Sequence, residues 1–325
     1  MALPAEVGAL ADLYYNMAAT HAATTANAVE QFWRTIPYDM SLIEGWERIR
    51  EPVLEIAARE QTASALMAAA YLQAQADAQG FELDTVPDVK AYVTPSDTAD
   101  YWLSYGVTGS LAASNQQGWP EVMARQFGLN LLTRTVGTMM LDAGREATQA
   151  GITAVPVIQG YYRKLRTPSC SRCAVLAGEF YEWNEGFLRH PNCDCEHVPA
   201  ADVDDSLAFD SYAAIESNQI TGLSKADRTA ILEDNADVNQ VINAKRGLRT
   251  TDIFGERIQT TTEGTTRRAV AGRRLIAASG TGTRPSGERF FRAANLRLTP
   301  REIYKQAGTD RELAARLLYK HGYVL

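Results

Sequence analysis

Apolar residues recur at helical spacing through much of the first 150 residues. Most steps are of three, four or seven residues, which is the spacing of one apolar stripe on a helix. The first stripe consists of Leu3, Val7, Leu10, Tyr14 and Met17. The second consists of Trp46, Ile49, Val53 and Ile56, then Ala63, Met67, Ala70 and Ala74. The third consists of Val122, Leu129, Leu132, Val136, Met139, Met140 and Ala143. We therefore expect long helices, the first two forming an antiparallel hairpin with its apolar stripes in the core.

Helix ends are marked by capping residues and helix breakers. Ser41 and Glu44 have the spacing of a capping box. Pro52 is expected to interrupt or restart the second helix because proline lacks the amide donor, and Gly151 is expected to end the third. Residues 81–100 contain two prolines among Asp, Ser and Thr, which predicts irregular structure. His21 lies on the first stripe and is expected to be a packed or edge residue rather than a ligand of a metal.

The pattern changes after residue 151. Residues 152–166 are rich in β-branched and aromatic residues, which predicts one or two strands, and Glu179–Trp183 predicts a short strand. A helix is expected over 223–246, with Ser224 as N-cap and Asp227 three residues later. Two short helices are expected to begin at Thr299 and at Thr309.

These elements predict a predominantly helical α+β fold. Residues 1–150 form a helical domain, 151–222 a strand-containing Cys/His module stabilised by zinc, and 223–325 a helical, basic C-terminal region. The last region includes a Gly- and Thr-rich stretch near 278–289 that predicts a flexible loop.

The composition is that of a soluble globular protein, with 46% hydrophobic and 22% charged residues. No apolar run approaches the roughly 20 residues that span a bilayer. The N-terminus lacks the basic and apolar regions of a secretory signal. We therefore expect a protein of a reducing compartment, where clustered cysteines indicate metal binding or catalysis before disulfides.

Charge is distributed unevenly along the chain. The net charge is −7, but residues 245–297 carry 12 Lys/Arg against 4 Asp/Glu, whereas the first 244 residues carry 15 against 32. A basic late segment on an acidic body predicts a polyanionic contact for that segment alone.

All four cysteines lie between Cys170 and Cys195. Cys170 and Cys173 form a C-x2-C pair, a common half-site for tetrahedral zinc, and the second half is expected within 190–197. The favoured ligand set is Cys170, Cys173, Cys193 and Cys195, with His190 as an alternate fourth ligand. Metal-free protein, with four reduced cysteines or with two disulfides under oxidising conditions, is the other interpretation.

The predicted zinc site is structural rather than catalytic. A site with three or four thiolates is normally closed, whereas catalytic zinc keeps an open position near a general base. The sequence contains no H-E-x-x-H, G-x-x-x-x-G-K-[ST], G-x-G-x-x-G or G-x-S-x-G motif. We therefore expect no enzymatic activity and no catalytic residues.

The segment CSRCAVLAGEFYEWNEGFLRHPNCDCEHVP, residues 170–199, resembles the Cys–His module of the Mu F-like head morphogenesis proteins, the minor capsid proteins of tailed phages. The shared pattern is C-x2-C, a glycine turn, then H-P-x-C-x-C and a later proline, here Pro199. The run GLSKADRTAILEDNADVNQVINAKRG with TTEGTTRRAVAG is similar to the form in phages of actinobacterial hosts.

The resemblance implies a virion protein that lies in the capsid interior or neck and passes through the host cytoplasm during assembly. Its implied partners are the portal protein and the major capsid or scaffold protein, without a membrane. Its implied role is prohead assembly and DNA packaging or ejection. Some relatives are described as capsid maturation proteases, so a maturation protease or zinc nuclease is a further alternative, although no catalytic constellation supports it.

The basic segment has several interpretations. If residues 267–274 are helical, their arginine pairs lie on neighbouring faces and can contact phosphates. An internal head protein that binds DNA nonspecifically through 245–297 is one alternative; docking on an acidic portal or scaffold surface, and a solvated basic tail, are others. Sequence-specific DNA recognition by the two terminal helices is disfavoured, because capped helix pairs are common. The candidate contact residues are Arg267, Arg268, Arg273, Arg274, Arg284, Arg289 and Arg292, with Arg297 following.

Overall fold

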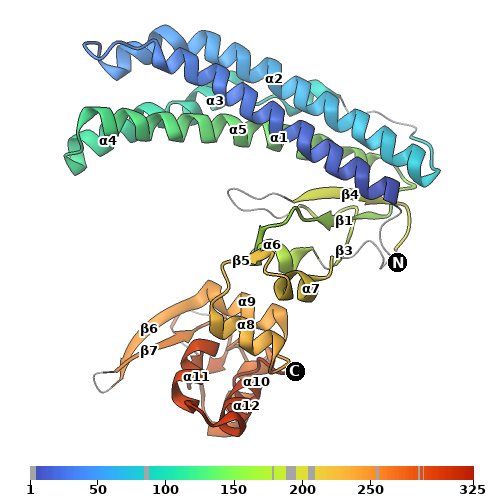
Figure 1. The fold of residues 1–325 in the computed structure, drawn as a ribbon, viewed down its shortest axis with the longest axis vertical. Coiled ribbons are helices and arrows are strands. Elements are labelled where there is room, and N and C mark those ends of the chain that lie inside the picture. Colours follow the sequence, from blue (N-terminus) through green and yellow to red (C-terminus); the bar gives the residue numbers. More distant parts are fainter. Residues whose placement is uncertain are drawn as a thin grey trace. The chain divides into compact units, whose positions relative to one another are not determined.

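The computed structural model describes residues 5–83, 88–177, 179–187, 195–203, 209–253, 256–284, 286–287 and 289–325. The chain divides into two compact units (Figure 1). The helical unit comprises Met1–Lys164 and Glu179–Ala208, and the C-terminal unit comprises Leu165–Gly178 and Phe209–Leu325. The predicted fold class, predominantly helical α+β with long N-terminal helices, is confirmed. The boundaries of these two units differ from the three regions expected from the sequence, 1–150, 151–222 and 223–325. Strands that follow residue 150 belong to the helical unit.

Three long helices build the helical unit: α1 (Ala5–Arg34), α2 (Leu42–Gln79) and α5 (Glu121–Ala154). They pack pairwise and lie side by side (Figure 1). Their shared core is apolar, and its most buried members include Val29, Val53, Leu103, Leu132, Val136 and Met140. Burial of this apolar surface is the main stabilising contribution to the bundle.

Shorter elements cover one side of α5. They are the 3₁₀ helix η1 (Val89–Tyr92), α3 (Ser96–Leu103) and α4 (Tyr105–Gln117). Helix α4 approaches α5 closely where Gly106 faces Gly128, since a Cβ atom on Gly128 would overlap the Gly106 carbonyl oxygen. The Ser110 hydroxyl donates a hydrogen bond to the Ala124 carbonyl across the same contact, at 2.5 Å. The small residues therefore allow the crossing that places α3 and α4 beside α5.

A small antiparallel sheet completes the helical unit. Its order is β3 (Phe180–Glu182), β1 (Gly160–Lys164), β4 (Glu196–Ala200). The predicted strands over 152–166 and 179–183 are thus confirmed in part, although 152–154 belong to α5. The sheet packs on the helices around Tyr71, whose ring stacks on Tyr14 at 4.4 Å and whose hydroxyl donates to the His197 carbonyl at 2.7 Å.

Two helices are longer than the sequence predicts. Pro52 lies inside α2 without ending it. The carbonyl that loses its partner there belongs to Arg48, which is exposed, so water can satisfy it. Gly151 lies inside α5, which continues to Ala154 because Gly151 and Ile152 are buried. In both cases tertiary packing overrides a local propensity.

The predicted stripes are correct in part. Val7 and Tyr14 are buried, but Met17 is 46% exposed and Val122 is 63% exposed. In α2 the buried seam beyond Ala57 includes Gln61 and Gln75, whereas Ala70 is exposed. Alanine is frequent on every face of α2, so its spacing does not identify the buried one. The Gln75 amide is buried because it donates to the Val7 carbonyl at 3.0 Å.

His21 is half-buried at the contact of α1 with α2, where its Nε2 donates to the Glu60 carbonyl at 3.0 Å. The prediction of a packed histidine is therefore confirmed. Residues 81–100 are less irregular than predicted, because α3 begins at Ser96.

The C-terminal unit combines short helices and small sheets. Strand β2 (Ser169–Cys170) pairs in parallel with β5 (Ile220–Thr221), and α6 (Ser171–Leu176), α7 (Ser211–Glu216), α8 (Lys225–Leu232) and α9 (Val238–Ala244) lie in the same unit. The predicted helix over 223–246 is wrong in its length. It breaks between α8 and α9, where Asn235 has a positive φ of 55° that a helix does not allow.

The second sheet of this unit has the order β10 (Arg297–Leu298), β7 (Glu256–Thr261), β6 (Leu248–Ile253). A separate pair joins β8 (Gly282–Thr283) to β9 (Arg292–Ala293), so part of the predicted flexible loop is an ordered ladder. Helices α10 (Val270–Ser279), α11 (Pro300–Ala307) and α12 (Arg311–Lys320) complete the unit. Thr299 caps α11 as predicted, whereas α12 is capped by Asp310 and not by Thr309.

None of the helices in the described part of the chain is both long enough and apolar enough to cross a membrane.

Candidate functional site

The predicted metal ligands are distributed over both units. Cys170 and Cys173 belong to the C-terminal unit and Cys195 to the helical unit. Cys193 and the alternate ligand His190 lie outside the described residues. Among the residues that are described, no group of three or more His, Cys, Asp or Glu is placed to hold a metal ion. The complete zinc site therefore stays a prediction.

The C-x2-C half-site has a defined geometry. Cys170 is the N-cap of α6, and its Sγ accepts a hydrogen bond from the Cys173 backbone N–H at 3.4 Å. Amide donors stabilise negative charge on sulfur, as a helix N-terminus does. Cys173 is buried and Cys170 is half-buried. The donor set and the tight turn fit one half of a tetrahedral thiolate site.

Five candidate contact arginines are exposed: Arg267, Arg268, Arg273, Arg284 and Arg289. The helical arrangement considered for 267–274 is wrong, because α10 begins at Val270 and the first arginine pair precedes it. The exposed aromatic side chains of Phe290 and Phe291 follow Arg289 in the chain, and the Arg267 N–H donates to the Phe291 carbonyl at 2.9 Å. The surface therefore combines guanidinium groups with aromatic rings.

The other arginines have structural contacts. Arg274 donates to the carbonyls of Tyr319 and Val324 and covers the Tyr319 ring at 3.7 Å. Arg292 donates to the Thr262 carbonyl at 3.2 Å. Arg297 is 1% exposed, and its hydrogen bonds to the His321 and Glu263 carbonyls lie within the C-terminal unit. These three side chains connect parts of the unit and are less available to phosphates than the exposed five.

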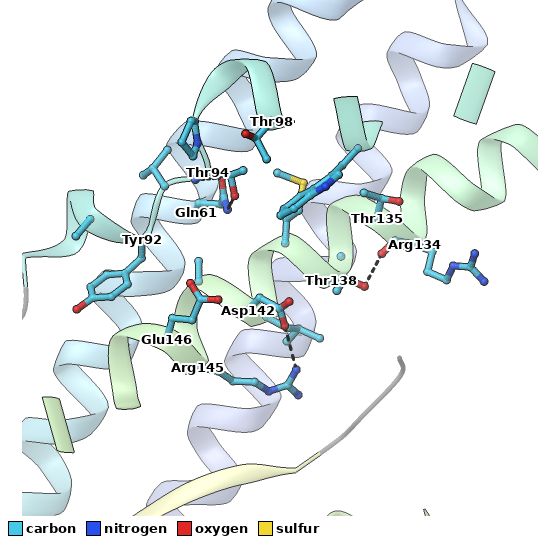
Figure 2. A pocket seen from close by; sticks show the side chains of 18 of the residues that line it. Gln61, Tyr92, Thr94, Thr98, Arg134, Thr135, Thr138, Asp142, Arg145 and Glu146 are labelled. Atoms are coloured by element: carbon cyan, nitrogen blue, oxygen red, sulfur yellow. Dashed lines mark hydrogen bonds and ion pairs between the residues drawn. The ribbon is translucent and has the colours of Figure 1, made fainter. Parts of the chain in front are cut away.

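One cavity of the helical unit was not predicted from the sequence. It is a cleft of about 1020 Å³ along α5, which we call the α5 cleft (Figure 2). One wall is α5 from Arg134 to Glu146, and the other is segment 91–98 with Trp102 and Tyr105. Gln61 of α2 holds this segment in place. Its amide donates to the Thr94 hydroxyl at 2.8 Å and accepts from the Thr94 N–H at 3.2 Å.

Carboxylates give the α5 cleft its polarity. Asp142 and Glu146 lie one turn apart on α5, and Figure 2 shows both side chains on the side of Tyr92 and Gln61. Arg145 bridges Asp142, with 3.7 Å between Nη1 and Oδ1, and Glu196 of β4, with 3.7 Å between Nη2 and Oε1 (Figure 2). Burial raises the pKa of Tyr92, and the negative charges of Asp88 and Glu146 raise it further. Among the described residues here, Asp142, Glu146 and Glu196 against the single cation Arg145 leave a net charge of −2 at this end of the cleft.

Aromatic rings line the opposite wall. Trp102 is 40% exposed and Tyr105 is 43% exposed, and the Tyr105 ring packs edge-on against Tyr101 at 5.2 Å. With the hydroxyls of Thr94, Thr98 and Thr138, the cleft offers aromatic faces, hydrogen-bonding groups and two carboxylates. These groups suit binding of a positively charged guest. The sequence signal was the cluster of aromatic residues at 101–105, but nothing in its pattern connects it to residues 134–146.

The two units differ in sign of charge. The helical unit contains 11 Lys/Arg and 26 Asp/Glu, for a net charge of −15, whereas the C-terminal unit contains 21 and 13, for a net charge of +8. The charge asymmetry seen along the sequence is therefore an asymmetry between compact units. Each unit attracts partners of opposite sign.

Comparisons with known proteins place the chain in a family. No curated protein and no solved structure is detectably similar to it. A family model described as VG15 protein matches residues 8–219, which include the α5 cleft and the whole cysteine segment. The match covers more than half of the chain, and the family is one of phage proteins. The chain therefore belongs to the VG15 protein family.

Proposed function

We propose that the chain is a minor capsid protein of a tailed phage, a head morphogenesis protein that acts with the portal in prohead assembly and in DNA packaging or ejection. The observation that carries the proposal is that the phage-family match, over 8–219, takes in the Cys–His segment resembling the Mu F-like module. The proposed role is structural, without catalysis. The proposed location is the capsid interior or the neck of the virion.

The location can be tested in purified particles. Mass spectrometry of proheads and mature virions is expected to find the chain in both, at fewer copies than the major capsid protein. Proheads that lack it are expected to assemble poorly or to fail in packaging DNA. Its absence from both kinds of particle would contradict the proposal, whatever the outcome of the zinc and DNA experiments below.

A structural zinc ion is part of the proposal. The half-site of Cys170 and Cys173, with its N–H···S contact at the start of α6, supports it. Zinc would contribute folding energy by holding chain segments that lack a large core of their own. The remaining ligands are proposed from Cys193 and Cys195, with His190 as the alternate.

Zinc content gives a direct prediction. Elemental analysis of the full chain is expected to find about one zinc ion per chain, because one tetrahedral site uses all four thiolates. Cys170→Ser is expected to lose the metal and to lower the melting temperature. Ser171→Ala, next to Cys170, is the matched control and should keep the metal. Stoichiometric zinc in the Cys170→Ser/Cys173→Ser double variant would exclude the site.

A second candidate function is DNA contact by the C-terminal unit. The exposed Arg267, Arg268 and Arg273, on a unit of net charge +8, favour it. Phe290 and Phe291, 47% and 40% exposed, add ring faces on which bases can stack. Contact through phosphates would be independent of sequence and strongly dependent on salt.

Replacing the exposed arginines tests the DNA candidate. Arg267→Ala/Arg268→Ala/Arg273→Ala is expected to weaken DNA binding in anisotropy measurements. It should also reduce the slope of log affinity against log salt by roughly 0.9 for each phosphate of duplex DNA that the variant no longer neutralises. Arg311→Ala/Arg316→Ala/Lys320→Ala removes the same charge from the exposed side of α12 and should change the slope less. If the two triple variants change the slope equally, DNA binding depends only on the net charge of the unit, and the surface of Arg267, Arg268 and Arg273 is not a specific contact.

A further inference from the structure

We propose that the α5 cleft is a docking site for a basic segment of a partner protein, with an arginine or lysine side chain inserted between the carboxylates of α5 and the aromatic wall formed by Trp102 and Tyr105. The inference concerns the helical unit alone. It does not depend on the zinc site or on DNA contact by the C-terminal unit.

The size of the cleft indicates a peptide rather than a single small amine. A volume of about 1020 Å³ lies at the upper end of ligand pockets, which are roughly 300–1,000 Å³. The lining follows α5 from Arg134 to Glu146, three helical turns, so several consecutive residues of a guest can contact it. The hydroxyl and amide groups along this length offer hydrogen bonds to a peptide backbone.

The charges select the guest. Asp142, Glu146, Arg134 and Arg145 all line the cleft, and Figure 2 marks the ion pair between Asp142 and Arg145, with 3.7 Å between Oδ1 and Nη1. Arg134 lies 12 residues from Glu146, roughly 18 Å along α5. Arg145 is 4% exposed and bridges Asp142 and Glu196, so its charge is largely balanced within the unit. The unit as a whole has a net charge of −15, which attracts a basic segment from a distance.

The aromatic wall supplies the second half of the recognition. A guanidinium or ammonium group over the face of Trp or Tyr gains roughly 0.5–1 kcal/mol at an exposed site and more when water is removed. Trp102 and Tyr105 are large rings that remain about two-fifths exposed beside the cleft. A basic side chain that covers them buries apolar surface in a cleft that Asp142 and Glu146 also line. A neutral apolar guest would bring no charge to match the net charge of −2 at this end of the cleft, and an acidic guest would be repelled.

The proposal predicts that peptide binding depends on the positive charge of the peptide and on the residues that line the α5 cleft. The probe is a fluorescein-labelled peptide in which arginine alternates with glycine and serine, and its twin has citrulline in place of every arginine. Binding to the full chain is measured by fluorescence anisotropy at low salt. The citrulline peptide is expected to bind roughly tenfold or more weakly than the arginine peptide, because citrulline removes the charge and keeps the shape of the side chain. Equal binding of the two peptides would overturn the proposal.

Variants locate the binding. Glu146→Gln and Trp102→Leu are each expected to weaken binding of the arginine peptide roughly fivefold, the scale of one partly exposed charge or one cation–π contact. The matched controls are Glu55→Gln, which removes an exposed carboxylate from α2, and Trp183→Leu, which removes an exposed tryptophan outside the lining. Both controls should change the affinity less than about twofold. If Glu55→Gln weakens binding as much as Glu146→Gln, the attraction is a general property of the acidic unit and the site is rejected.

Competition distinguishes the proposed guest from small cations. Spermidine and magnesium ions are each added against the labelled peptide at constant ionic strength. The proposal expects displacement only by unlabelled arginine peptide at comparable concentrations. If spermidine or magnesium ions displace the labelled peptide at the same concentration as the unlabelled peptide does, the cleft binds small cations and the peptide proposal is overturned.

The variants at Glu146 and Trp102 are expected to fold, because both side chains are exposed. An unchanged circular dichroism spectrum checks this.

Discussion

Arg297→Ala is expected to destabilise the C-terminal unit by roughly 3–5 kcal/mol, because it leaves several buried acceptors without a donor at roughly 1–3 kcal/mol each. The Arg297 guanidinium is 1% exposed and connects three parts of the unit. Its Nε donates to the His321 carbonyl at 2.8 Å, and its Nη1 donates to the Glu263 carbonyl at 2.9 Å. Its Nη2 donates to Gln240 Oε1 at 3.2 Å. Removal would leave these buried acceptors without their donor.

The surroundings of Arg297 are shaped around its guanidinium. The group lies 4.4 Å from the centre of the Tyr323 ring, and Gly264 leaves the space that Nη1 occupies, since a Cβ atom there would lie 2.5 Å from it. Gly264 also has a positive φ of 68°, which favours glycine. Burial lowers the pKa of Arg297, and the nearby Tyr323 and Glu263 oppose that change. A planar group with several donors fits here, and an ammonium does not reach all three acceptors.

Chemical unfolding followed by circular dichroism measures the effect. Arg297→Lys keeps the charge and is expected to lie between the wild type and Arg297→Ala. Arg311→Ala, on the exposed start of α12, is the control and should change the free energy of unfolding by less than about 0.5 kcal/mol. A destabilisation of under about 1 kcal/mol in Arg297→Ala would show that the network contributes little to folding.

Local features of the fold could be predicted from the sequence, because they depend on neighbouring residues. Ser41 accepts from the Glu44 N–H, Ser224 forms a capping box with Asp227, and Thr299 caps α11, as their spacing indicates. The same reasoning failed at Pro52 and Gly151. At those positions burial of the flanking turns decides the structure, and local preference does not.

The candidate sites depend on contacts far apart in the chain, and these could not be read from local patterns. The α5 cleft needs Thr94 to bond Gln61 across 33 positions, so that segment 91–98 lies along α5. The excess of basic residues over 245–297 is visible in the sequence, but its arginines divide into exposed and structural ones only when the fold is known. Arg297 and Arg267 look alike in the sequence, yet one is buried among carbonyls and the other is exposed.

His321 is expected to make the stability of the C-terminal unit fall as the pH falls from about 6.5 to about 4. The imidazole is 4% exposed, and its Nδ1 accepts a hydrogen bond from the Leu298 N–H at 3.2 Å, which requires that nitrogen to be unprotonated. Burial lowers the pKa of His321 from 6.5 to about 4, and the positive charges of Lys320 and Arg297 act in the same direction. The folded unit therefore holds a neutral imidazole over the whole of this pH range.

The sign follows from which state binds the proton. Between pH 6.5 and about 4 the unfolded chain protonates His321 and the folded unit does not, so acid favours unfolding. The full contribution, about 3 kcal/mol at 1.36 kcal/mol for each pKa unit, is present above pH 6.5 and is lost as the pH reaches about 4.

Asn in place of His321 can accept the same hydrogen bond without titrating. Urea unfolding of the wild type and of His321→Asn across this range therefore isolates the histidine, since other titrating groups are common to both. The difference between the two free energies is expected to change by about 3 kcal/mol in favour of the variant on acidification. A difference that stays constant with pH would mean that His321 titrates alike in the folded and unfolded chains.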